Sequence, residues 1–144
     1  MKVTEELVNR MYQYSGVSRE KVLEVLKGLD PKKYLEKPYN TKWKKDNPLY
    51  GYSYYLSEFL YYYIAPPGSI CKRIYFAQGK KGTLQQYIYF VQWPDTTVVD
   101  LTLAQHTDVP NYGGAKEASL KPRIQPTTKA IAEKLGYSDE DLDL

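Results

Sequence analysis

A stripe of apolar side chains in the middle of the chain constrains the fold more than any other feature. Its members follow the i, i+3, i+4, i+7, i+8 spacing of a helix with one face in a core. They are Leu56, Phe59, Leu60, Tyr63 and Ile64. We expect this helix to begin near Ser53, because Asn47-Pro48 and Gly51 interrupt the chain just before it. The Ser53 hydroxyl would then either cap the first turn or belong to a functional site.

Ser53 is also part of a short motif. The sequence Asn47-Pro48-x-x-Gly51-x-Ser53 follows Trp43, and Val98-Val-Asp-Leu-Thr-Leu-Ala-Gln105 begins about 45 residues later. Over roughly residues 40 to 130 these segments resemble the YunG-like family of bacteria and phages. The resemblance implies a papain/transglutaminase-like fold. In that family a Cys at a helix start, a His on a strand and an Asp form the catalytic arrangement.

The chain departs from this family at two of those three positions. Ser53 stands where the family has its Cys, and the segment from Gln86 to Tyr89 contains no His. Gln86 or Tyr87 would lie where the base would have been, and only Asp100 keeps its place as the orienting acid. A serine hydroxyl without a base is a poor nucleophile. The resemblance therefore implies a catalytically degenerate site.

The single His and the single Cys are weak candidates for catalytic residues. His106 falls in an expected loop from Ala104 to Arg123, where we expect it to be solvated, although it would reach the cleft if this loop folded back. Cys71 falls in an alternating run that predicts a strand, where a free Cys is usually buried. With so few Cys and His, we expect no metal centre, and we expect no cofactor.

The remaining pattern predicts an α+β fold in which helices pack on a small antiparallel sheet. A helical hairpin occupies residues 1–30, with Thr4 and Ser18 as N-caps. Strands are expected at 70–77, 84–93 and 98–103, with a hairpin turn across 78–82. A last helix starts at Pro126. We expect one domain over residues 1–137, with its core within 40–130, and a mobile acidic tail at 138–144.

Charge and tyrosine content point to the kind of ligand. Once the four acids of the tail are set aside, 20 basic residues stand against 13 acidic ones, and the chain holds 16 tyrosines. The basic segment 32–45 is either a solvated face or lies over the start of the central helix. Aromatic rings stack on bases and lysines hold phosphate. We therefore expect a protein that binds and sequesters a small anionic ligand, such as a nucleotide-derived signal.

The expected ligand contacts lie around the central helix, the second strand and the loop after the third. They are Trp43, Lys44, Tyr50, Tyr52, Ser53, Tyr54, Gln86, Tyr87, Asp100 and Lys116. The sequence has no long apolar run and no signal-peptide pattern, so we expect a soluble, cytoplasmic protein. With the resemblance, this suggests a phage protein that counters a nucleotide messenger of a bacterial host.

Three other functions remain open from the sequence. An active hydrolase would use Ser53 with His106 and Asp100, and would lose turnover when Ser53 is replaced. A nucleic-acid-binding protein would use the basic segment 32–45, but the chain shows no known reading motif. A partner-binding protein or homo-oligomer would use the tyrosines as an interface.

Overall fold

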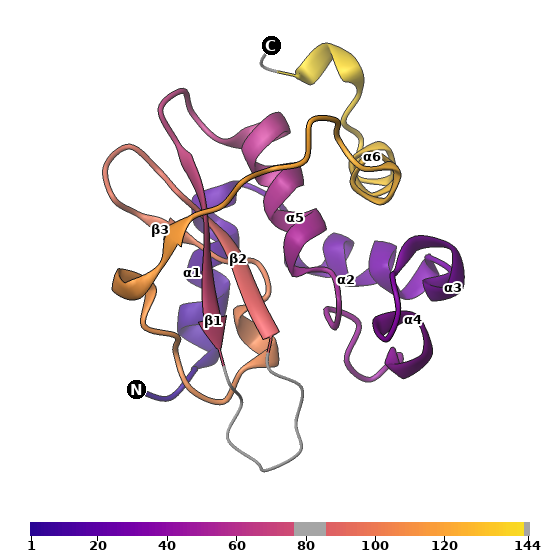
Figure 1. Ribbon diagram of the computed structural model, residues 1–144, viewed down its shortest axis with the longest axis horizontal. Helices are drawn as coiled ribbons and strands as arrows, with labels where there is room; N and C mark the ends of the chain where they lie inside the picture. Colours follow the sequence, from indigo (N-terminus) through magenta and orange to yellow (C-terminus); the bar gives the residue numbers. More distant parts are fainter. Residues whose placement is uncertain (77–85, 143–144) are drawn as a thin grey trace.

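A computed structural model describes residues 1–76 and 86–142, and shows helices packed against an open, four-stranded antiparallel sheet (Figure 1). The strand order is β3-β2-β1-β4, with β1 at Ile70–Phe76, β2 at Gln86–Gln92, β3 at Val98–Val99 and β4 at Lys116–Glu117. The α-helices are α1 (Glu5–Ser15), α2 (Arg19–Gly28), α3 (Pro31–Tyr34), α4 (Tyr39–Lys42), α5 (Ser53–Phe59) and α6 (Pro126–Lys134). Shorter turns are η1 (Leu60–Ile64), η2 (Leu103–Gln105), η3 (Tyr112–Gly114) and η4 (Asp139–Asp141). The α+β prediction is confirmed.

The two N-terminal helices begin where their caps predict. The Thr4 hydroxyl accepts a hydrogen bond from the Leu7 N–H at 3.2 Å, and the Ser18 hydroxyl accepts one from the Lys21 N–H at 3.3 Å. Gly16 ends α1 in the left-handed conformation, with φ of 72°. These local signals are sufficient because each satisfies backbone groups that the helix itself leaves unpaired.

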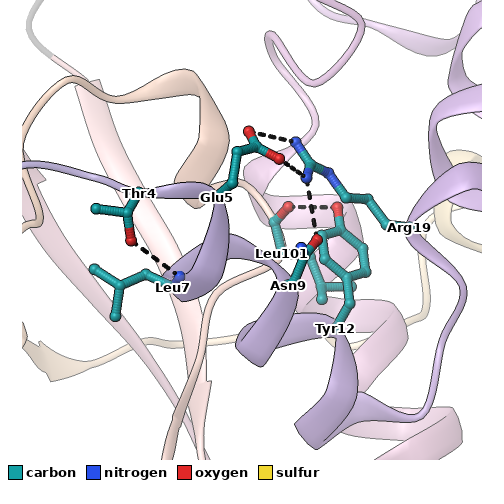
Figure 2. Close-up of polar contacts among 7 residues, drawn as sticks. All are labelled: Thr4, Glu5, Leu7, Asn9, Tyr12, Arg19 and Leu101. Carbon is teal, nitrogen blue, oxygen red and sulfur yellow. Dashed lines mark hydrogen bonds and ion pairs between the residues drawn. The ribbon is translucent and has the colours of Figure 1, made fainter.

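Side chains of the helical hairpin connect it to the rest of the molecule (Figure 2). Arg19 Nη1 of α2 lies 2.6 Å from Glu5 Oε2 of α1 and 3.2 Å from Asn9 Oδ1. The buried Tyr12 hydroxyl donates to the Leu101 carbonyl at 2.7 Å. The first contact joins α1 to α2, and the second fixes α1 to the segment that follows β3.

The central helix begins at Ser53, as predicted, and the first part of its apolar stripe is buried. It does not stay α-helical to its end, because residues Leu60–Ile64 form a π-helical turn in which the Ala65 N–H donates to the Leu60 carbonyl at 2.7 Å. Pro66 follows and has no N–H with which to extend the helix. The sequence pattern did not indicate this wider turn.

The sheet is built on the predicted pair of long strands. β1 and β2 pair from Ile70 opposite Gln92 to Phe76 opposite Gln86. The turn predicted between them at 78–82 lies outside the described residues. The third strand is shorter than predicted, because the Asp100 carboxylate accepts hydrogen bonds from the Thr102 N–H and hydroxyl, both at 2.9 Å, and turns the chain. β4 lies in a segment that we expected to be loop.

In the arrangement of the elements, α5 lies between the sheet and α6, whereas α1 lies against the sheet itself (Figure 1). The helix α5 contacts β2 on one side and α6 on the other, while α1 contacts β3. A single cluster of buried apolar side chains extends from Val8 of α1 to Ala132 of α6. The central position predicted for this helix is therefore confirmed.

The basic segment 32–45 is more ordered than expected, because it contains α3 and α4. Gly51, with φ of 84°, allows this segment to approach the start of α5 closely. A Cβ atom at this glycine would lie 3.0 Å from the Cβ of Tyr39 and 3.3 Å from the Leu35 side chain. The segment therefore lies over the start of the central helix, while its lysines are exposed as in a solvated face, so each of the two expectations holds in part.

The acidic segment near the C-terminus forms a turn. Asp139–Asp141 make a 3-10 helix in which the Ser138 N–H donates to Asp141 Oδ2 at 2.7 Å, and Leu142 packs against the core. We expected these residues in a mobile tail. None of the helices within residues 1–76 and 86–142 is long and apolar enough to cross a membrane.

Candidate functional site

A cavity of about 320 Å³ opens beside the start of α5. Its walls come from the basic segment, α5, β2, the turn η2 and the segment before α6. The lining residues are Glu36, Tyr39, Gly51, Ser53, Tyr54, Tyr55, Tyr87, Tyr89, Gln105, Ser119 and Lys121. This volume is at the lower end of the range for small-molecule sites. The cavity therefore suits a small ligand.

Five of the eleven lining residues are tyrosines. Tyr54 of α5 meets Tyr89 of β2 edge to face, with ring centroids 5.1 Å apart, and packs against Tyr55 at 5.7 Å. Tyr39 is supported from behind by Tyr50, at 5.4 Å. Edge-to-face pairs hold each other's orientation, so the cavity has a preformed aromatic surface.

The Ser53 hydroxyl lies at the cavity wall but is engaged by the backbone of β2. It accepts a hydrogen bond from the Tyr89 N–H at 2.8 Å and donates to the Tyr89 carbonyl at 3.2 Å. Tyr89 lies two residues before Val91, which pairs with Val99 of β3, so its backbone groups face the edge that the short β3 leaves open. Ser53 thus completes the hydrogen bonding of β2. It is not an N-cap, since Tyr52 occupies that position.

Asp100 belongs to a different cluster. Its carboxylate is fully buried, and Oδ2 accepts a hydrogen bond from the Tyr112 hydroxyl at 2.7 Å. The Tyr112 ring packs against Phe90, with centroids 4.9 Å apart. Phe90 points to the opposite face of β2 from Tyr89, because side chains alternate along a strand. Asp100 therefore organises the segment after β3 and does not line the cavity.

His106 lies in the same buried region as Asp100. It is only 6% exposed, so the expectation that it would be solvated is wrong. Burial lowers the pKa of its imidazole, and the nearby Asp100 carboxylate partly offsets that effect. The turn η2 folds this segment inward, and it is Gln105, the neighbouring residue, that reaches the cavity.

Of the residues predicted to contact a ligand, the structure brings Ser53, Tyr54 and Tyr87 together around the cavity. Tyr52 is instead fully buried in the core, so it cannot contact a ligand in this cavity. Tyr50 lies behind Tyr39 and supports the wall indirectly.

The other predicted contacts lie away from this cavity. The Trp43 indole N–H donates to the Pro48 carbonyl at 3.1 Å, which folds the motif before α5. Lys44 is exposed, and Lys116 lines a second hollow on the sheet. Gln86 begins β2, but its side chain is outside the described part of the structure.

Several lining residues were not predicted. Two of these are charged, Lys121 and Glu36, and Lys121 Nζ lies 3.6 Å from Glu36 Oε1 and 5.9 Å from the centroid of the Tyr54 ring. Gln105 ends the motif that contains Asp100, which was the only available signal for it. Tyr89 could have been found from its position two residues after Tyr87, on the same face of the strand.

A buried carboxylate on α5 was also missed. Glu58 has no exposed surface; Oε1 accepts a hydrogen bond from the Gln125 N–H at 2.7 Å, and Oε2 accepts one from the Tyr54 hydroxyl at 2.8 Å. The Tyr54 hydroxyl in turn accepts from the Lys121 N–H at 3.0 Å. Burial, together with Glu58, raises the pKa of Tyr54. This network holds the segment before α6 against the cavity wall.

Two further kinds of chemistry would use a cysteine nucleophile or a metal ion. Burial raises the pKa of the Cys71 thiol to about 12, with a smaller contribution from Glu58, so it is a poor nucleophile. Within the described ranges, no group of three or more His, Cys, Asp or Glu side chains is placed to hold a metal ion.

Comparison of the chain with protein-family models, curated proteins and solved structures found no match.

Proposed function

We propose that this protein binds a small, planar, anionic ligand in the tyrosine-lined cavity without cleaving it, as a catalytically degenerate papain/transglutaminase-like domain. The proposal rests on the hydrogen bonding of the Ser53 hydroxyl. Its only proton is donated to the Tyr89 carbonyl, and neither Asp100 nor His106 lines the cavity. A serine nucleophile needs a base within hydrogen-bond reach. The same cavity nevertheless offers surfaces for binding.

The aromatic wall supports a planar ligand. Stacking of a base on an aromatic side chain contributes about 1–3 kcal/mol and needs no catalytic group. Tyr87 has 49% of its surface exposed although it lies on a central strand, so a face of its ring is accessible. Gln105 adds an amide with donors and acceptors that can fix the orientation of a ring edge.

Lys121 supports an anionic group on that ligand. Its ammonium group pairs with Glu36, but both side chains are exposed, at 50% and 72%. An exposed ion pair of this kind is worth about 0–1 kcal/mol. A ligand anion can therefore replace Glu36 at Lys121 with little loss. A role in removing a nucleotide-derived signal during phage infection is the biological proposal, and it depends on the family resemblance.

The test is to incubate the purified protein with a panel of nucleosides and of mono-, di- and cyclic nucleotides, and to separate free from bound compound by filtration. We expect depletion of some compounds and their intact recovery after heat denaturation. New product peaks would show turnover and overturn the proposal. No depletion of any compound would also overturn it, and would favour a partner-binding protein.

A pair of tyrosine variants tests whether the cavity is the site. Tyr87→Ala removes a ring at the cavity and should weaken binding by about 5- to 150-fold, the equivalent of one stacking contact. Tyr14→Ala is the matched control, because Tyr14 lies on α1 and has a similar exposure, 47% against 49% for Tyr87. Dissociation constants measured by titration calorimetry should change only for Tyr87→Ala. Equal affinities for the two variants would place the ligand elsewhere.

A further inference from the structure

A second hollow lies next to the tyrosine-lined cavity on the sheet. It has a volume of about 300 Å³ and is lined by Arg73, Ile74, Tyr75, Tyr87, Gly114 and Lys116. Tyr87 lines both hollows, so the two are neighbours that share this side chain as a wall. Tyr75 and Tyr87 are each 49% exposed and meet edge to face at 5.4 Å.

The charges in this second hollow are unbalanced. Arg73 of β1 and Lys116 of β4 lie directly opposite each other in the antiparallel pair. Like charges at such positions destabilise a sheet. Among the residues that the structure describes, neither cation forms an ion pair with a carboxylate; the recorded pairs involve other side chains. The two cations together are therefore available to an anion.

Arg73 is also held in place for binding. Its guanidinium carbon lies 4.7 Å from the centroid of the Tyr87 ring, the geometry of a cation–π contact. A guanidinium that is stacked in this way loses less freedom when its planar fork binds a phosphate. Lys116 adds a second positive charge from the neighbouring strand.

We propose that Arg73 and Lys116 form a phosphate subsite, and that the ligand is a nucleotide with its base in the tyrosine-lined cavity and its phosphate in the second hollow. Tyr87 is the wall between the two parts. This inference rests on the proposed function; it narrows the anionic ligand to a nucleotide and places its phosphate at Arg73 and Lys116 instead of at Lys121.

The first experiment compares the nucleotide that wild-type protein binds most tightly with the corresponding nucleoside. We expect the nucleotide to bind more tightly, and Arg73→Gln and Lys116→Gln each to weaken nucleotide binding by about tenfold. Lys116→Gln, which leaves the contact between Arg73 and Tyr87 in place, should not change nucleoside affinity. Lys129→Gln, an exposed lysine on α6, removes the same charge elsewhere and should have no effect. Equal losses in all three variants would mean that only net charge matters, and would overturn the subsite.

The second experiment separates failure of the subsite from failure of the proposed function. Pyrophosphate alone is titrated into isotope-labelled protein, and backbone amide shifts are followed by NMR. We expect shifts at Arg73, Gly114 and Lys116, and none of this size at Lys129. Nucleotide binding without these shifts would overturn the subsite but leave the proposed function intact. Shifts at these amides without any nucleotide or nucleoside binding would overturn the proposed function and identify a site for a simple anion, which would overturn the nucleotide assignment as well.

Discussion

Tyr89 of β2 has a backbone N–H and a carbonyl that face the edge beyond the end of the two-residue β3. The Ser53 hydroxyl pairs with both groups: it accepts from the N–H at 2.8 Å and donates to the carbonyl at 3.2 Å. Ser53→Ala should lower the free energy of unfolding by about 1–2 kcal/mol, because it leaves these two groups without their protein partner. Urea denaturation measures this change. Under the proposed function, the same variant keeps its ligand affinity within a few fold.

Ser119→Ala is the control for this prediction. Ser119 lines the same cavity, but its exposed hydroxyl makes no hydrogen bond within the described residues. Its replacement should change the free energy of unfolding by less than about 0.5 kcal/mol. If the two variants were equally stable, Ser53 would not be a structural partner of β2.

The helix α5 carries the buried Glu58 toward the segment that leads into α6. Glu58→Ala should lower the free energy of unfolding by about 3–5 kcal/mol, since it removes the partner of the Gln125 N–H and the Tyr54 hydroxyl in a fully buried place. Glu58→Gln keeps an oxygen that accepts from the Gln125 N–H, so it should lower the free energy of unfolding by less than Glu58→Ala does. Thermal unfolding and hydrogen exchange at Gln125 measure both effects.

Glu133→Ala on α6 is the matched control, because this glutamate is exposed. It should have little effect on stability and none on the exchange of the Gln125 amide. Unchanged protection of that amide in Glu58→Ala would contradict the role given to α5 as the support of this segment.

Elements with their own local signals could be predicted from the sequence. Thr4 and Ser18 cap α1 and α2, and the apolar stripe locates α5, because each depends on neighbours within a few residues. β4 could not be predicted, since it depends on the pairing of Lys116 with the distant Arg73. The early end of β3 comes from the local bonds between Thr102 and Asp100, but the alternating pattern of 98–103 fits a longer strand equally well.

In the candidate site, too, the residues that could be predicted are those marked by a local sequence pattern. Ser53, Tyr54 and Tyr87 could be found because the motif and the strand pattern place them near the helix start. Lys121 lies in a segment without any pattern, and hydrogen bonds from this segment to Tyr54 and Glu58 hold it beside the cavity. The sequence order of Ser53 and Asp100 could not show that the Asp100 carboxylate binds a tyrosine that packs on the other face of β2.

Across the whole molecule, the buried segment after β3 makes stability depend on pH in two opposite ways. Burial raises the pKa of Asp100, although hydrogen bonds from Tyr112 and Thr102 and the charge of His106 act against this. A raised pKa adds stability at low pH that is lost as the pH rises through it. Burial lowers the pKa of His106, so the unfolded chain takes up a proton that the folded chain does not. His106 therefore reduces stability as the pH falls below the ordinary histidine value.

The two effects can be separated because His106 is the only histidine in the chain. Between about pH 7.5 and 5.5, it is the one side chain whose ordinary pKa lies in the window. Urea unfolding should show wild-type stability falling by up to about 1.4 kcal/mol for each pH unit below about 6.5, relative to His106→Asn, in which only the opposing effect of Asp100 remains. Lys129→Gln should keep the wild-type slope. Parallel curves for wild type and His106→Asn would mean that His106 titrates alike in the folded and unfolded chain, and that its burial does not couple protonation to the fold.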